Sequence, residues 1–596
     1  MIGSGYIEED SIGKVYDVKL LRRLLKYAKP YRWFIIVAIV LNIFSSAFGP
    51  LRPYLTQIAI DKGALKNNIK VVGVVALVFI AALAVQSIIN YYVSYYTQYV
   101  GQKIIFDIRK NLFSHLLSLS ARFFDKNPVG RLVTRTTNDV ESLNEMFSSG
   151  IVMIFSDIFL IVWILVFMFY MNAKLAITAL LTMPFLVVAV MIFRKKARDS
   201  FREVRSKLAK LNSYLQEKLN GIKTIIIYNK EDFELNSFKK INQEYTNANL
   251  KSIFYYAVFY PVVELISSVA VALIIWEGSS SYLRGEITFG EIAAFIQFVE
   301  MFFRPIRDLS EKYNILQTAF ASSERIFKLL DIKEEKSAPV IPKKLENIKG
   351  TIEFKNVWFA YNDEDYVLKD VSFKVEAGET AAIVGHTGAG KTSIINLILK
   401  FYEYQKGDIL IDGISVKDLE QEEIRKRVGF VSQDSSIFKG SLLFNLTLEN
   451  ENISLEKIEE TIRIDGIKEF IEKLPSGLNY EIKEKGTNLS HGQKQLAAIA
   501  RVLIRDPKII ILDEATANID SETEKLLQKA FKKLFVNRTS LVIAHRLSTI
   551  YNSDKIIVMN KGSVADIGDH ETLLNKKGIY YKLYKLQFYN QIKTNI

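Results

Sequence analysis

The first half of the chain alternates long apolar stretches with long basic ones, whereas the second half consists of short apolar runs separated by polar turns. In the first half, six stretches are long and apolar enough to cross about 30 Å of hydrocarbon as helices. Buried helices of a water-soluble protein are rarely so long and so uniformly apolar. The pattern predicts six membrane spans, over residues 33–57, 71–96, 151–171, 175–193, 257–276 and 287–303.

The polar connections between these stretches are unequal. Long basic segments join the second stretch to the third and the fourth to the fifth, whereas the other connections are short. Because Lys- and Arg-rich connections stay in the cytoplasm, both long segments and both chain ends are predicted to be cytoplasmic. Breaks near residues 125–130 and 215–225 predict helices that leave the membrane and turn against a soluble domain. Residues 17–29 predict a basic amphipathic helix at the inner surface.

A few residues inside the predicted spans depart from the apolar pattern. Pro50 and Pro53 predict a kink near the outer end of the first span. A charge in hydrocarbon is costly, so each ionisable group there is a candidate for function, with structural pairing as the alternative. These groups are Arg52, Asp157, Glu264 and Glu300.

The second half begins after a charged, proline-bearing stretch, residues 330–350, which is typical of a linker. This divides the chain into a membrane domain, residues 1–329, and a soluble domain, residues 351–596. The segment "TAAIVGHTGAGKTSIINLIL" reads as strand, glycine loop and helix, and it matches G-x-x-x-x-G-K-[ST]. Such a loop cradles phosphates with backbone N–H groups. The candidate nucleotide-binding residues are Gly385, His386, Thr387, Gly388, Ala389, Gly390, Lys391, Thr392 and Ser393.

Within that loop, Lys391 is expected to reach the β- and γ-phosphates, and the Thr392 hydroxyl is expected to ligate Mg²⁺. A second motif, "PKIIILDEATANID", is a buried strand that ends in Asp513 and Glu514. Asp513 is the expected magnesium carboxylate, and Glu514 is placed to polarise an attacking water. The alternative for the two acids is a solvated strand end.

A further helix, in "LSHGQKQLAAIARVL", begins with small polar residues and has Ser490 as its expected cap. A helix start of this kind exposes backbone N–H groups and attracts phosphate. The sequence therefore offers two phosphate-binding ends about a hundred residues apart.

Composition narrows the function classes. The net charge of +13 fits nucleic acid or an acidic membrane surface, and the long apolar runs favour the membrane over nucleic acid. The absence of cysteine excludes disulfides, zinc–thiolate sites and cysteine nucleophiles. Five histidines disfavour a histidine-built metal site. The charged first thirty residues do not have the pattern of a cleavable signal peptide.

The order of these motifs, with "LSHGQ", "ILDEAT" and "IAHR" after the glycine loop, resembles an ATP-binding cassette. The spans, with "FFDKNPVGRLVTRTTNDV" and "ITFGEIAAFIQFVEMFFRPI", resemble bacterial half-transporter exporters of the multidrug and lipid class. The resemblance implies an α-helical six-span membrane domain with long cytoplasmic helices, followed by an α/β P-loop ATPase domain. It also implies ATP and Mg²⁺ as cofactors and a place in the bacterial cytoplasmic membrane.

The resemblance further implies roles for individual residues. Tyr361 would stack on adenine, although a strand aromatic in a core is the alternative. Gln433 would sense Mg²⁺ and the attacking water, with a surface turn as the alternative, and His545 would contact the γ-phosphate. Asp520 matches a conserved aspartate position of the family, and residues 484–486 match a segment that touches the membrane helices. The signature residues Ser490, Gly492 and Gln493 would bind ATP held by a second chain.

One cassette and six spans imply that the chain pairs with a second half-transporter. The signature has His491 where glycine is usual, and "TANID" replaces the usual "SALD", a spelling that favours a heterodimer over a homodimer. The predicted function is ATP-driven export of a hydrophobic or amphipathic substrate, drug-like or lipid. A dedicated lipid or glycolipid flippase and a membrane-anchored regulatory ATPase are the alternatives.

Overall fold

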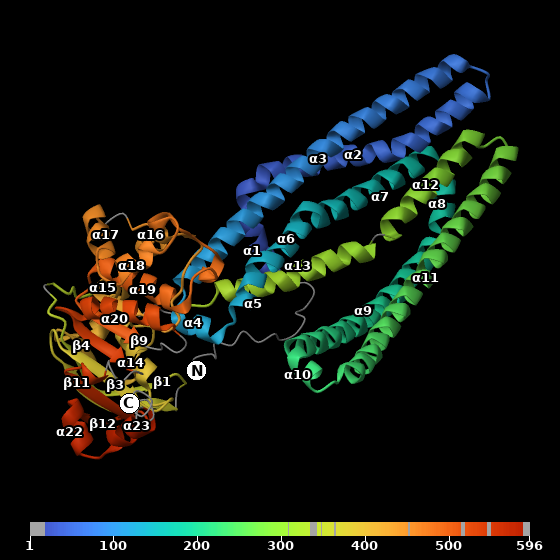
Figure 1. The fold of residues 1–596 in the computed structure, drawn as a ribbon. Coiled ribbons are helices and arrows are strands. Elements are labelled where there is room, and N and C mark those ends of the chain that lie inside the picture. Colours follow the sequence, from blue (N-terminus) through green and yellow to red (C-terminus); the bar gives the residue numbers. More distant parts are fainter. Residues whose placement is uncertain are drawn as a thin grey trace. The chain divides into compact units, whose positions relative to one another are not determined.

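A computed structural model describes residues 18–307, 309–333, 342–346, 348–362, 365–450, 453–513, 519–544 and 550–587 (Figure 1). The chain separates into two compact units. The first comprises Met1–Ser118 and Asn127–Ile332, and the second comprises Leu119–Lys126 and Lys333–Ile596. The short segment Leu119–Lys126 therefore belongs with the C-terminal unit, although it lies between two helices of the N-terminal unit in sequence.

The first unit is entirely helical within the described residues. Five of its helices are long and apolar enough to cross a membrane, and the first five predicted spans fall inside them. The main elements are α1 (Val18–Ala28), α2 (Arg32–Ile58), η2 (Ala59–Ala64), α3 (Ile69–Ser118), α5 (Val129–Thr134), α6 (Val140–Glu145), α7 (Ile151–Met171), α8 (Ala173–Leu180), α9 (Met183–Asn220), α10 (Ile222–Ile227), α11 (Glu231–Leu283), α12 (Phe289–Arg307) and α13 (Leu309–Leu330).

The sixth predicted span, residues 287–303, coincides with α12, which is also a helix. This helix carries Glu291, Glu300, Arg304 and Arg307 and is not among the five helices that meet the length and apolarity criterion. The helical fold class is confirmed, and the count of six spans stays a prediction.

The fourth predicted span is not one continuous helix. It divides into α8 and α9, with a break at Leu181 and Thr182. The break precedes Pro184, which lies in the first turn of α9, where a missing N–H is tolerated. The tight hairpin before it begins at Asn172, whose side chain accepts a hydrogen bond from the Leu175 N–H at 3.1 Å.

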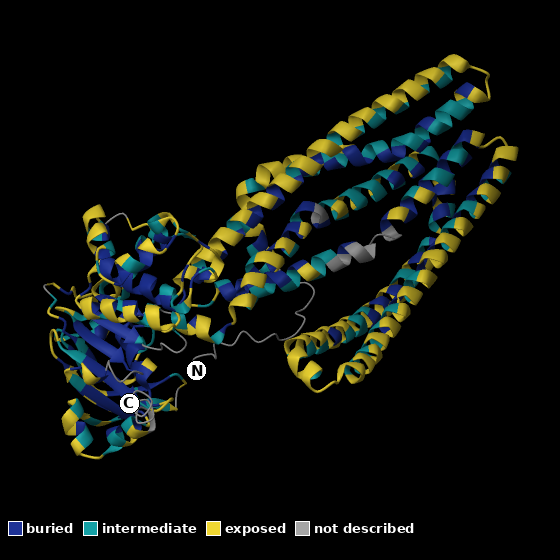
Figure 2. Cartoon of the chain, viewed as in Figure 1, coloured by how far each residue is buried: buried dark blue, intermediate teal, exposed yellow. Residues whose placement is uncertain are grey.

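Long helical extensions follow the spans. In α9 and α11 the extensions are held together by ion pairs, Lys207 with Glu244 at 2.9 Å and Lys251 with Glu203 at 2.8 Å. Figure 2 shows that much of the surface of these extensions is exposed. The predicted breaks near 125–130 and 215–225 correspond to the ends of α4 (Ala121–Lys126) and α9.

The second unit is built on two sheets. An antiparallel sheet has the order β2-β1-β4-β5, and a six-stranded sheet has the order β12-β11-β3-β10-β9-β6. In the six-stranded sheet all strands except the edge strand β12 run parallel to their neighbours. The strands are β1 (Ile352–Ala360), β2 (Tyr366–Val375), β3 (Thr380–Gly385), β4 (Lys406–Ile411), β5 (Ile414–Ser415), β6 (Val428–Val431), β7 (Gly440–Ser441), β8 (Glu481–Ile482), β9 (Ile509–Asp513), β10 (Thr539–Ile543), β11 (Lys555–Asn560) and β12 (Ser563–Gly568).

The parallel strands explain the short apolar runs of the sequence. Strands β9 and β10 are buried on both faces, which requires unbroken apolar runs rather than alternation (Figure 2). Among the described residues, the α-helices of this unit after β3 are α14 (Lys391–Ile398), α15 (Gln421–Arg427), α16 (Leu442–Thr447), α17 (Leu455–Ile462), α18 (Ile467–Glu472), α19 (His491–Arg505), α20 (Ser521–Phe535), α22 (His570–Asn575) and α23 (Ile579–Gln587).

Part of the predicted linker contacts this unit. Leu345 is buried in the core of the antiparallel sheet. The backbone N–H groups of Lys349 and Gly350 donate to the Asp412 carboxylate at 2.8 and 3.0 Å.

Candidate nucleotide site

The candidate site lies where the parallel strands of the six-stranded sheet end. Ile543 of β10 is in register with Asp513 of β9 and with Ile383 of β3. Leu512 pairs with Val431, the last residue of β6. The carboxyl ends of these four strands therefore share one edge, the usual place for ligands in open α/β sheets. Glu514 directly follows β9 and His545 comes two residues after β10 in sequence, and both lie outside the described residues.

The glycine loop between β3 and α14 leaves a helix end without a side-chain cap. Gly390 has a φ of +96°, and a Cβ there would lie 2.6 Å from Leu368 Cδ2. His386, Thr387 and Gly388 are exposed, whereas Ala389 is buried. The first N–H groups of α14 have no side-chain partner at the cap, so this end suits an anion.

Lys391 is folded against that loop. Its ammonium group donates to the carbonyl oxygens of Gly385 at 2.7 Å and His386 at 3.0 Å. Burial lowers the pKa of Lys391, and the negative charge of Asp513 acts in the opposite direction. The structure thus places the lysine of the loop and the aspartate of β9 within electrostatic reach of each other.

The two residues after Lys391 face different surroundings. Thr392 is exposed, whereas Ser393 is buried and its Oγ lies 3.1 Å from the Tyr361 hydroxyl. Asn396 also donates to that hydroxyl at 3.2 Å. The half-buried Tyr361 ring packs edge-on against Phe359. Adenine stacking by Tyr361 stays a prediction, and Ser393 has the observed role of fixing this tyrosine.

The segment Leu119–Lys126 attaches beside Tyr361. Arg122 donates to the Tyr361 carbonyl oxygen at 3.1 Å, and the Tyr402 hydroxyl donates to the Asp125 carboxylate. Burial, followed by this hydrogen bond, raises the pKa of Tyr402. The Tyr402 ring packs edge-on against Tyr361, with centroids 4.9 Å apart. Sequence reasoning placed a turn against the soluble domain here but missed Tyr402, because no local pattern marks the receiving residue.

The signature helix α19 begins differently from α14. Ser490 is its exposed cap, and its Oγ accepts from the Gln493 N–H at 3.2 Å. The Gln493 side chain in turn accepts from the Ser490 N–H at 2.9 Å, which completes a capping box. Both side chains predicted to contact ATP are thus used, at least in part, to start their own helix.

Gly492 lies where α19 meets α20. A Cβ at Gly492 would overlap the Cγ2 of Thr523 and lie 3.1 Å from the Cγ2 of Ile519. Asp520 caps α20 by accepting from the Thr523 N–H at 2.8 Å, and this backbone hydrogen bond is the main cause of its lowered pKa. Gln433, two residues beyond β6, is exposed.

The predicted magnesium ligands are chemically suited to that ion. Thr392, Gln433 and Asp513 offer hydroxyl, amide and carboxylate oxygens, the hard ligands that Mg²⁺ prefers. In the described part of the chain, no group of three His, Cys, Asp or Glu side chains forms a ready-made metal cluster. This donor set fits an ion that is completed by nucleotide phosphates and water.

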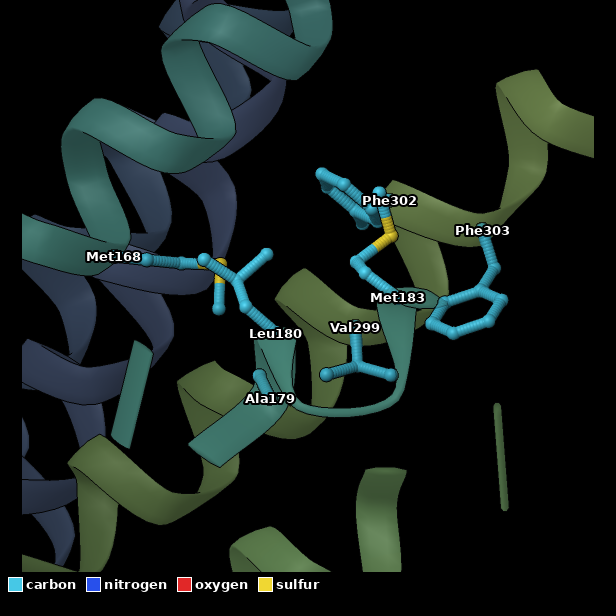
Figure 3. A pocket seen from close by; sticks show the side chains of 7 residues that line it. All are labelled: Met168, Ala179, Leu180, Met183, Val299, Phe302 and Phe303. Atoms are coloured by element: carbon cyan, nitrogen blue, oxygen red, sulfur yellow. The ribbon is translucent and has the colours of Figure 1, made fainter. Parts of the chain in front are cut away.

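The ionisable groups inside the predicted spans have different surroundings. Asp157 pairs with Lys312 of α13, which is the structural alternative foreseen for it. Arg52 donates to the Gln86 side chain, and Glu264 and Glu300 are exposed. Figure 3 shows a small pocket lined only by apolar side chains, namely Met168, Ala179, Leu180, Met183, Val299, Phe302 and Phe303.

Both halves of the chain match known families. Residues 35–306 match the ABC transporter transmembrane region, and residues 368–517 match the ABC transporter ATP-binding domain. The chain is 37% identical over 596 residues to "Uncharacterized ABC transporter ATP-binding protein YknV" of Bacillus subtilis, covering 99% of this chain and 98% of that protein. It is 35% identical over 579 residues to a Staphylococcus aureus protein named "Putative multidrug export ATP-binding/permease protein", covering 95% of this chain and 100% of the relative.

A helical membrane region fused to a P-loop ATPase domain defines a membrane transport ATPase. The chain belongs to the ABC transporter family. It is an ATP-driven exporter in which an ABC ATPase is coupled to transport, and its half-transporter architecture implies dimerisation.

Proposed function

We propose that the protein exports a hydrophobic or amphipathic compound, drug-like or lipid, across the cytoplasmic membrane of a bacterium. The relative named for multidrug export supports this substrate class. Both chain ends would be cytoplasmic, as the long basic connections indicate. The main support for the proposed ATPase site is that Lys391 and Asp513 lie within electrostatic reach of each other at the carboxyl edge of the sheet.

In this proposal the loop Gly385–Ser393 and Lys391 hold the phosphates, and Tyr361 holds adenine. Thr392, Gln433 and Asp513 would hold Mg²⁺, which neutralises phosphate charge when bound. Glu514 would polarise the attacking water and His545 would contact the γ-phosphate, in keeping with their positions one residue after β9 and two residues after β10 in sequence.

The second helix end serves a second chain. Ser490, Gly492, Gln493 and Asp520 would complete the nucleotide site of the partner, so that ATP joins two chains and hydrolysis releases them. The Ser490 hydroxyl accepts from Gln493 and still has its own proton to donate. The exposed position of Ser490 supports a role in trans, and "TANID" favours a different half-transporter as partner.

Complementation tests this arrangement. In a homodimer, Lys391→Ala and Ser490→Arg should each be nearly inactive alone. A mixed dimer contains one site with both lesions and one with neither, so mixing should restore part of the ATPase activity. With a different partner chain, Ser490→Arg should damage nucleotide photolabelling of the partner and spare labelling of this chain. Labelling lost only on this chain would reject the trans site.

Catalysis by Glu514 has its own test. Glu514→Gln keeps the size of the side chain and removes the charge that polarises water, so ATP binding should persist. Turnover at this site should fall by roughly a hundred-fold, the usual size of a general-base effect. With the partner site silenced, near-normal turnover would show that Glu514 is not the base.

Orientation is tested by cysteine labelling, which this cysteine-free chain permits. Asn67 and Asn220 are both exposed, in the connection after η2 and at the end of α9. An impermeant thiol reagent applied to intact cells should label Asn67→Cys and leave Asn220→Cys unlabelled until the cells are opened. The reverse pattern would invert the topology.

A further inference from the structure

One arginine inside the membrane unit has no counter-charge in the described part of the chain. Arg52 is half-buried on α2, in the first predicted span. Lys312, a buried cation of the same unit, is paired with Asp157. Arg52 instead donates to the neutral side chain of Gln86 on α3. A guanidinium carries five N–H donors and no acceptor, so one amide oxygen leaves most of its donors for another group.

The neighbours of Arg52 form a chain of hydrogen-bonded polar side chains between α2 and α3. Gln86 donates through its amide to the Ser45 carbonyl oxygen at 3.2 Å, and Ser45 Oγ donates to Asn90 at 2.5 Å. One hydrogen bond thus anchors the Gln86 amide to the Ser45 backbone, and the Gln86 amide oxygen in turn holds the arginine. A side chain held in this way is positioned rather than merely tolerated.

The nearest candidate counter-charge lies on α12. The N–H of Gly290 donates to Asp61 at 2.8 Å, and a Cβ at Gly49 would lie 3.2 Å from Met301 Cε. These contacts align α2 antiparallel to α12 and put Arg52 within about one helical turn of the level of Glu300. Glu300 is nevertheless exposed and forms no ion pair with the described residues.

We propose that Arg52 holds an anionic group, a phosphate or a carboxylate, of the amphiphile that the membrane domain exports. An arginine on an apolar span is costly, and an anion bound to it offsets that cost. Guanidinium also binds phosphate and carboxylate with two parallel hydrogen bonds, which a lysine does not.

This inference rests on the proposed export function, and the test separates the two. The purified dimer is placed in nanodiscs of neutral lipid, and three probes with one alkyl chain are compared: dodecyl phosphate, dodecylphosphocholine and dodecyltrimethylammonium. Binding and stimulation of ATPase are both measured. Dodecyl phosphate should bind the wild-type dimer best, and inorganic phosphate, which has no alkyl chain, should not compete with it at equal concentration.

Arg52→Gln should weaken dodecyl phosphate binding by about tenfold or more, the size of one charge-assisted contact. It should weaken the zwitterionic dodecylphosphocholine less and leave dodecyltrimethylammonium, which has no anionic group, unchanged. Arg52→Lys should still prefer dodecyl phosphate but bind it more weakly than the wild type. This variant provides the test if Arg52→Gln misfolds. Lys66→Gln, which removes an exposed charge from the connection between η2 and α3, is the matched control and should change nothing.

Three results would overturn the proposal. Dodecyl phosphate binding that is absent in the wild type or unchanged in Arg52→Gln rejects an anion site. Equal weakening for all three probes reduces Arg52 to a structural role. If dodecyl phosphate binding is lost in Arg52→Glu and in Glu300→Arg and is recovered in the double variant, Glu300 is the counter-charge of Arg52. If ATPase activity and export of a neutral dye are retained alongside any of these results, only this inference fails. If both are absent in the wild type, the export function itself is rejected.

Discussion

Two helices of the ATPase domain begin at small residues, and their first turns are satisfied in different ways. Helix α14 has Gly390 at its cap with no side-chain hydrogen bond, whereas α19 starts with the reciprocal bonds of Ser490 and Gln493. The first end keeps its N–H groups for a ligand. In the second end the capping box uses the N–H groups of Ser490 and Gln493, and the N–H groups of His491 and Gly492 and the Ser490 proton are not part of it. The proposed roles of the two ends, to hold nucleotide and to close over it, fit this difference.

The largest effect is expected at the first end. Lys391→Ala removes the ammonium group that faces the loop carbonyls and Asp513. ATP photolabelling of this chain should be lost, and turnover at this site should fall by about a hundred-fold or more, as when one preorganised electrostatic contact is removed. Lys439→Ala, at an exposed lysine of the same domain, is the control. Retained labelling would mean that the backbone of α14 alone holds the phosphates.

The second end is tested with two substitutions of Ser490 that both keep the helix cap and differ in charge. Ser490→Asn and Ser490→Asp both keep a good helix cap, so both should fold as the wild type does. Only aspartate places a negative charge against the partner's phosphate, and its ATPase activity should fall by about tenfold more than that of the asparagine variant. Equal activity in the two variants would show that no phosphate approaches Ser490.

The sequence predicts those parts of this comparison that are local. The strand–loop–helix pattern around Lys391 and the cap at Ser490 each depend on a few consecutive residues, and the structure has both elements where they were expected. The engagement of Gln493 in the cap was not foreseen, although a glutamine three residues after a serine is a known signal. The roles of these residues toward ATP stay predictions.

Contacts between distant residues could not be predicted. The bond from Tyr402 to Asp125 spans 277 residues, and Tyr402 belongs to no motif of the sequence. The break between α8 and α9 was also not predicted, because an apolar stretch has the same hydropathy whether its helix is continuous or interrupted. Of the residues expected to perform catalysis, Glu514 and His545 lie outside the described residues, so their arrangement remains a prediction.

A smaller effect is expected from the packing that supports the second end. A methyl group in Gly492→Ala would overlap Thr523 and push α19 away from α20. Overpacking of this kind costs about 1–3 kcal/mol, which thermal unfolding of the ATPase domain within the dimer would register. Adding Thr523→Ser removes the overlapping methyl and should recover part of the loss. Gly578→Ala, where a Cβ meets only Asp566 at 3.7 Å, is the control. A stable Gly492→Ala protein would show that α19 and α20 can separate at no cost.

The smallest effect is a proton linkage that only the first end should show. Burial lowers the pKa of Lys391 despite Asp513, and nucleotide phosphates should raise it by stabilising the ammonium form. Between the free and bound pKa values, binding takes up a proton, so affinity should fall as pH rises through the free value. Below that value the lysine is charged in both states and the dependence disappears. Calorimetry at a series of pH values below the ordinary lysine pKa, in buffers of different ionisation enthalpy, measures the uptake. Lys391→Arg stays charged throughout and should show none, so equal uptake in both proteins would place the proton elsewhere.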